Sequence, residues 1–176
     1  FSSDPQLPKM QDVYGLNPAC VVVYPMYRGV SALVGMDIRT FEGDQPGDEF
    51  AEVKRSWDDY DFFFVHIKKT DSAGEDGDID KKVHVIESVD EALPQLMALK
   101  PDVLAITGDH STPCTMKSHS WHPVPLLLWA PGTTRPDEED KFGERYCAKG
   151  NLGTFPGTDL MQFLLGHADK LRKFGA

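Results

Sequence analysis

The stretch "DVLAITGDHSTPCTMKSHSWHPVPLLLWA", residues Asp102–Ala130, joins two apolar runs through a polar connection. The runs "DVLAIT" and "VPLLLWA" are continuously apolar rather than alternating, as expected of strands whose sheet is covered on both faces. The connection belongs to a segment that holds three of the chain's six histidines and one aspartate within fourteen residues. An Asp-His pair directly after a buried strand predicts a site at the edge of the sheet.

Two earlier apolar runs predict further strands, "ACVVVY" over Ala19–Tyr24 and "DFFFVHI" over Asp61–Ile67. Strands that alternate with helices predict an α/β fold, a three-layer sandwich around a mostly parallel sheet. The length of 176 residues fits a single domain over 1–176.

Three helices are expected. Between the runs "DFFFVHI" and "DVLAIT", six apolar residues recur at helical spacing: Ile79, Val83, Ile86, Val89, Leu93 and Leu96. Pro94 should bend or break this helix. Another helix is expected over Asp159–Arg172, with Thr158 or Asp159 able to cap its start. The segment Glu49–Trp57 is a weaker candidate.

Composition narrows the partners and the compartment. A formal net charge of −10 argues against a nucleic-acid surface, whereas local cations or metal ions would still permit a small phosphorylated metabolite. No apolar run approaches the roughly 20 residues of a membrane span, and no signal peptide is recognisable. Cys20, Cys114 and Cys147 form no CxxC pair, which favours reduced thiols in a cytoplasmic protein.

Acids and imidazoles follow two of the predicted strands. Asp109 and His110 follow the run "DVLAIT" after Gly108, and His119 lies on the connection that returns to the same edge of the sheet. Asp71 and Glu75 follow "DFFFVHI", with Gly74 between them to permit a tight backbone path. Three carboxylates and two imidazoles suit Mn²⁺, Zn²⁺ or a similar divalent pair. Two such ions about 3.5–4 Å apart form a clamp for phosphoryl transfer.

Simpler interpretations stay open. An Asp-His pair after a strand is more often a turn with a hydrogen-bonded histidine, and Asp71 and Glu75 alone would be solvated charges. The remaining histidines are expected to pack, to form hydrogen bonds or to face solvent: His66, His84, His122 and His167. A calcium loop with Asp76, Asp78, Asp80 and Glu87 at positions one, three, five and twelve is disfavoured, because its sixth position is Lys81 instead of glycine.

Three segments in this order resemble the C-terminal metal-binding part of the cofactor-independent phosphoglycerate mutases: "HIKKTDSAGEDGD", "TGDHSTP" and "KSHSWHPVPLLLWAPG". The archaeal-type branch, within the alkaline phosphatase superfamily, is the most similar. "YGLNPACVVVYPMYRGVSALVGMD" and "GNLGTFPGTDLMQFLLGHA" resemble it too, so the resemblance covers nearly the whole chain. It implies an alkaline-phosphatase-like fold.

The resemblance also implies roles for individual residues. Asp71, Glu75 and His119 match the positions that hold one metal, although many members have histidine where this chain has Glu75. Asp109 and His110 match part of the second metal site. The implied cofactors are two divalent ions, Mn²⁺ first, with Zn²⁺, Co²⁺ or Mg²⁺ as alternatives. Arg28 lies roughly where the family presents a basic residue to the substrate phosphate.

The family's serine nucleophile and its inserted substrate-orienting domain have no counterpart in this sequence. Ser111 more simply caps a turn and Cys114 more simply packs, so the catalytic nucleophile is expected outside this chain. We therefore interpret the chain as the carboxyl-terminal piece of a larger mutase that interconverts 3- and 2-phosphoglycerate through a phosphoserine. The alternatives are a related phosphotransferase, such as a homoserine kinase, and a non-catalytic remnant of the fold.

Overall fold

The computed structural model of the 176-residue chain describes residues 6–171, which fall into two compact units divided after Leu99. Each unit is described by itself below. Among the described residues, no helix combines the length and the apolar composition that a membrane span requires.

The first unit is built on a three-stranded parallel sheet. Its strands are β1 (Pro18–Val22), β2 (Asp37–Arg39) and β3 (Phe62–His66), in the order β2-β1-β3. All five residues of β1 are buried, as its continuous apolar sequence predicts for a central strand. Val22 pairs with His66, so β1 and β3 end level with each other. This register brings the loops that follow both strands to one edge of the sheet.

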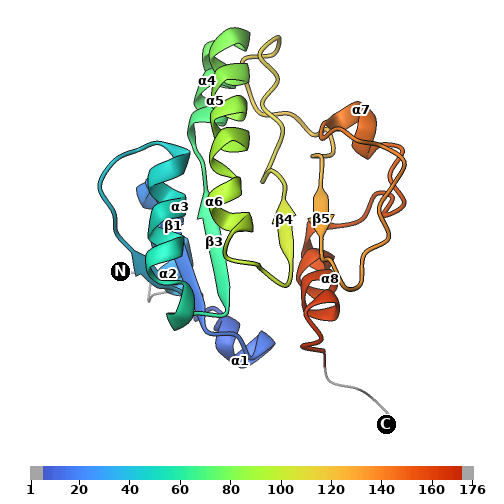
Figure 1. Ribbon diagram of the computed structural model, residues 1–176. Helices are drawn as coiled ribbons and strands as arrows, with labels where there is room; N and C mark the ends of the chain where they lie inside the picture. Colours follow the sequence, from blue (N-terminus) through green and yellow to red (C-terminus); the bar gives the residue numbers. More distant parts are fainter. Residues whose placement is uncertain (1–5, 172–176) are drawn as a thin grey trace. The chain divides into compact units, whose positions relative to one another are not determined.

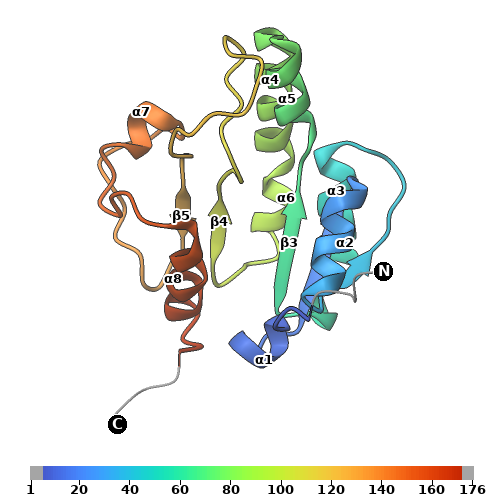
Figure 2. The ribbon, with the colours of Figure 1, turned by 180° about the vertical axis from the view of Figure 1, so that it is seen from behind.

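Helices cover the two faces of this sheet. Figures 1 and 2 show α3 (Pro46–Arg55) on one face of β1 and α2 (Pro25–Leu33) on the other. The core between these layers is made mainly of small and β-branched side chains, with one aromatic ring: Ala19, Cys20, Val21, Val22, Phe50 and Val53. The expected α/β fold with helix, sheet and helix layers is confirmed in this unit.

The helix expected between the second and third strands is confirmed, and so is its break at Pro94. It forms α5 (Ile79–Ala92) and α6 (Pro94–Met97), preceded by α4 (Lys69–Asp76). Val85 and Ala92 are buried on α5, whereas Ile79, Val83 and Ile86 are exposed. The unit also contains α1 (Met10–Tyr14) and the short 3-10 helix η1 (Trp57–Asp59).

The second unit contains an antiparallel strand pair, β4 (Leu104–Ile106) and β5 (Leu127–Trp129). Strand β5 is shorter than the predicted run because Pro125 has no N–H for a strand ladder. The helices are α7 (Glu144–Cys147), the 3-10 helix η2 (Gly157–Asp159) and α8 (Leu160–His167). Asp159 stands at the N-cap of α8 without a side-chain cap bond, so the capping prediction is wrong. Helix α8 ends at His167 and Asp169 has a positive φ of 53°, so the predicted continuation of the helix through residues 168–171 is wrong; Arg172 itself lies outside the described residues.

Candidate metal centre

Asp109 and His110 follow β4 and hold each other in place. Asp109 Oδ1 accepts the backbone N–H of His110 at 2.9 Å, and Asp109 Oδ2 lies 3.3 Å from His110 Nε2. Two ligand atoms bound to one ion at about 2.0–2.2 Å are separated by roughly 2.8–3.6 Å in octahedral or tetrahedral geometry. The spacing of this carboxylate and imidazole therefore fits two ligands of a single divalent ion.

Thr112 orients the His110 ring. Its buried hydroxyl Oγ1 lies 3.2 Å from His110 Nδ1. A hydrogen bond at one imidazole nitrogen fixes the ring and leaves the other nitrogen for a metal. Here the other nitrogen is Nε2, the one beside the Asp109 carboxylate.

A backbone bridge brings His119 next to His110. Ser120 N–H donates to the Ser111 carbonyl at 2.8 Å, which closes the connection between β4 and β5 into an antiparallel bridge. As a result, the ring centroids of His110 and His119 are 3.8 Å apart, with a tilt of 32°. The two imidazoles therefore lie side by side within the second unit.

Asp71 and Glu75 lie in the first unit, on α4. They were expected on a loop with Gly74 at a tight turn, and this expectation is wrong: Gly74 is buried inside the helix. Four residues apart on a helix, the two carboxylates share one face. Because α4 begins three residues after β3 ends, that face lies near the edge where β1 and β3 end.

Lys68 lies beside the candidate ligand Asp71, and the sequence reasoning missed it. Its ammonium pairs with the Asp71 carboxylate and lies 5.2 Å from the centroid of the Tyr24 ring. The hydrogen bond to Asp71 is the main cause that raises the pKa of Lys68, with smaller contributions from Asp71, Glu75 and Tyr24 charges. The signal was available in "KKTD", where two lysines stand between a strand end and a candidate ligand.

Arg28 lies on α2 and is partly buried. Its Nε donates to the Val22 carbonyl at 2.9 Å, at the carboxyl end of β1. The guanidinium is therefore fixed at the edge of the sheet to which Lys68 also belongs. Its expected contact with a substrate phosphate remains a prediction.

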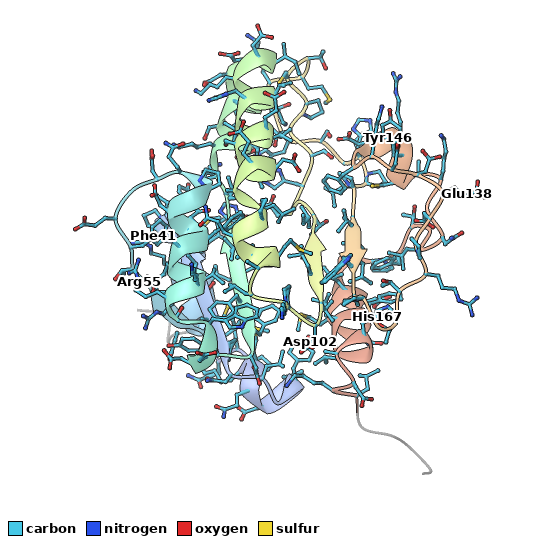
Figure 3. All side chains as sticks on the ribbon, in the orientation of Figure 1. Phe41, Arg55, Asp102, Glu138, Tyr146 and His167 are labelled. Carbon is cyan, nitrogen blue, oxygen red and sulfur yellow. The ribbon has the colours of Figure 1, made fainter. Side chains whose placement is uncertain are left out.

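The other histidines have structural surroundings of their own. His66 stacks on Tyr27 with ring centroids 4.0 Å apart, and His122 Nδ1 lies 2.8 Å from the Ser120 hydroxyl. His84 is exposed on α5. His167, labelled in Figure 3, has its Nδ1 2.6 Å from the Thr133 hydroxyl.

The local structure does not support the calcium loop at Asp76 or the turn-capping role of Ser111. Asp78 caps α5 by accepting the Lys81 N–H at 2.9 Å, so most of the proposed calcium loop is helix. The Ser111 hydroxyl donates to the His122 carbonyl at 3.3 Å and helps to close the connection instead of capping a turn. Among the described residues, Cys20, Cys114 and Cys147 form no disulfide.

Relatives of this chain are phosphoglycerate mutases by name. It is 54% identical over 176 residues to a probable 2,3-bisphosphoglycerate-independent phosphoglycerate mutase of Aquifex aeolicus, and 52% identical over 177 residues to one of Thermus thermophilus. These alignments cover 100% and 99% of this chain but only 43% of each relative. The chain therefore spans less than half the length of the curated relatives it matches.

Two solved structures have a similar fold. The PH0037 protein from Pyrococcus horikoshii matches 96% of this chain and 54% of its own, with a TM-score of 0.91 and 35% identity. The cofactor-independent phosphoglycerate mutase from Thermoplasma acidophilum matches 93% of this chain and 40% of its own, with a TM-score of 0.75 and 25% identity. The family described as the metalloenzyme superfamily matches residues 2–167. The resemblance found in the sequence motifs is thus confirmed, and the chain belongs to the metalloenzyme superfamily.

Proposed function

We propose that the chain is the metal-binding part of a phosphoglycerate mutase that interconverts 3-phosphoglycerate and 2-phosphoglycerate through a phosphoserine intermediate. The observation that carries the proposal is the local geometry around His110, where Asp109, His110 and His119 present a carboxylate and two imidazoles within one closed connection. The names of the relatives support the reaction class. The nucleophilic serine is expected in the portion of the relatives that this chain does not cover.

Five residues would hold two divalent ions. Asp109 and His110 would take one ion, and His119 would take the other together with Asp71 and Glu75 of the first unit. This ligand set of three carboxylates and two imidazoles suits Mn²⁺, with Zn²⁺, Co²⁺ and Mg²⁺ as alternatives. Bound divalent ions supply Lewis acidity, which lowers the pKa of a nucleophilic hydroxyl and neutralises charge on a phosphoryl group.

The protein's own residues would preorganise this chemistry. Thr112 holds the His110 ring, so the nitrogen beside Asp109 is directed at an ion without a search through ring orientations. The Ser111–Ser120 bridge fixes the distance between the two imidazoles. Arg28, held by the end of β1, would bind the phosphoryl group of the substrate. The substrate is accordingly a small phosphorylated metabolite, and the overall charge of −10 disfavours nucleic acid.

Activity of the full-length protein tests the proposal. The unchanged enzyme should convert 3-phosphoglycerate, and Asp109→Ala or His110→Ala should reduce turnover by at least about a hundredfold, which is typical of a lost catalytic electrostatic group. A full-length enzyme that phosphorylates homoserine with ATP and leaves 3-phosphoglycerate unchanged would replace the mutase with a related phosphotransferase. Unchanged turnover in both variants would reject the metal assignment.

A further inference from the structure

Lys68 lies between the two loops that leave the level ends of β1 and β3. Its ammonium pairs with Asp71, on the helix that follows β3, and sits over the ring of Tyr24, which follows β1. The side chains of Lys68 and Asp71 are only 29% and 13% exposed. The ammonium is thus held at the edge of the sheet where Arg28 is also fixed.

Lys68 places a positive charge at the N-terminus of α4, where the helix dipole disfavours it. Helix α4 begins with Lys68 at the N-cap and Lys69 as its first residue, yet positive charge is disfavoured at a helix N-terminus. Lys69 is compensated outside the site, by Asp44 at 2.8 Å. Lys68 is compensated only through Asp71 among the ion pairs formed by the described residues, and Asp71 is a proposed metal ligand. A local rule broken beside a candidate ligand points to function.

The positive charge of Lys68 partly balances the negative charges of the proposed carboxylate ligands. Asp71 and Glu75 contribute two negative charges from one face of α4 to the proposed ligand set. Lys68, paired with Asp71, adds one positive charge beside them. A divalent ion that takes Asp71 displaces the ammonium from that carboxylate, and the flexible stem of lysine lets the ammonium turn to a new anion.

We propose that Lys68 is a substrate-positioning residue that leaves Asp71 when a divalent ion binds and then pairs with the phosphoryl oxygens of a phosphate monoester. This inference rests on the proposed function, because it requires Asp71 to be a metal ligand. The lysine would couple the two binding events: the ion frees the ammonium, and the free ammonium attracts the phosphoryl dianion. By linkage, the phosphate monoester should strengthen ion binding by the same factor.

Calorimetric titration of the full-length protein with Mn²⁺ tests the first step. Lys68→Met should bind Mn²⁺ about three- to tenfold more tightly than the unchanged chain, because the ion no longer competes with a partly buried ammonium. Lys69→Met is the matched control: it removes the same charge one position away, and its Mn²⁺ affinity should stay within about twofold. Lys68→Arg keeps the charge and should stay near the unchanged chain.

Titration with 3-phosphoglycerate at saturating Mn²⁺ tests the second step. Lys68→Met should bind it at least about tenfold more weakly, the loss expected for one charge-assisted hydrogen bond, while Lys69→Met should be unchanged. Equal behaviour of Lys68→Met and Lys69→Met in both titrations would overturn the inference while leaving the metal site in place. An unchanged chain that binds Mn²⁺ no better than Asp71→Asn would overturn the proposed function and this inference together.

Discussion

Replacing Glu49 with glutamine should stabilise the first unit at neutral pH. Glu49 lies on α3, is only 2% exposed, and its Oε2 has no hydrogen-bond partner among residues 6–171. Burial raises the pKa of this carboxyl from 4.5 to about 8, with Lys69 opposing the rise and Asp48 and Asp44 adding to it. Folding therefore favours the protonated acid, and glutamine imitates that form.

The size of the effect follows from the two pKa values. The stabilisation from holding the protonated acid is complete below pH 4.5 and is lost as the pH rises through about 8. At about 1.36 kcal/mol per pH unit, the cost reaches about 3 kcal/mol at pH 7. Glutamine does not titrate, so the free energy of unfolding of Glu49→Gln should exceed that of the unchanged chain by a margin that grows across this window.

Urea unfolding followed by far-UV circular dichroism at pH 4.5 and pH 7.5 measures this margin. Glu52→Gln is the matched control from the same helix, since Glu52 is fully buried but paired with Arg39 at 2.9 Å and Arg55 at 2.6 Å; Figure 3 labels Arg55. This control should lose at least about 1 kcal/mol at both pH values. A margin for Glu49→Gln that is equal at the two pH values would refute the reasoning.

Three further substitutions test separate parts of the structure. Asp78→Ala removes the side chain that caps α5 and should cost about 1 kcal/mol in urea unfolding; no loss would show that the cap is not needed. Val21→Ala, in the fully buried centre of β1, should cost about 2 kcal/mol, and a loss below about 0.5 kcal/mol would contradict the packing described for β1. Glu75→His should move the metal preference from Mn²⁺ towards Zn²⁺ in competitive titrations, and an unchanged ratio of affinities would remove Glu75 from the ligand set.

The sequence predicted β1 well because burial on both faces leaves a strong signal. The runs "ACVVVY" and "DFFFVHI" became β1 and β3, and Pro94 broke the helix as expected. The surroundings of Asp71 were predicted less well. Glycine and polar residues in "DSAGED" favoured a loop, yet these residues form a helix in which Ala73 and Gly74 are buried. Tertiary packing outweighed local propensity there.

The sequence named candidate ligands for the site but gave no account of their local geometry. The family resemblance pointed to Asp109, His110 and His119, whereas the bridge between Ser111 and Ser120 that brings the two imidazoles together has no signature in the sequence. The buried Glu49 was equally hidden, because an acidic residue early in a helix is usually a solvated one. Pairings between residues far apart in the chain are set by tertiary contacts, which a single sequence does not record.

A Mn²⁺ titration of single variants of the full-length protein tests most directly whether Asp71 and His119 are metal ligands. Asp71→Asn and His119→Ala should each weaken Mn²⁺ binding by at least about tenfold. Asp76→Asn and His84→Ala, which remove the same chemical groups from exposed positions, should leave it unchanged. Mn²⁺ affinities for Asp71→Asn and His119→Ala equal to those of the two controls would contradict this assignment.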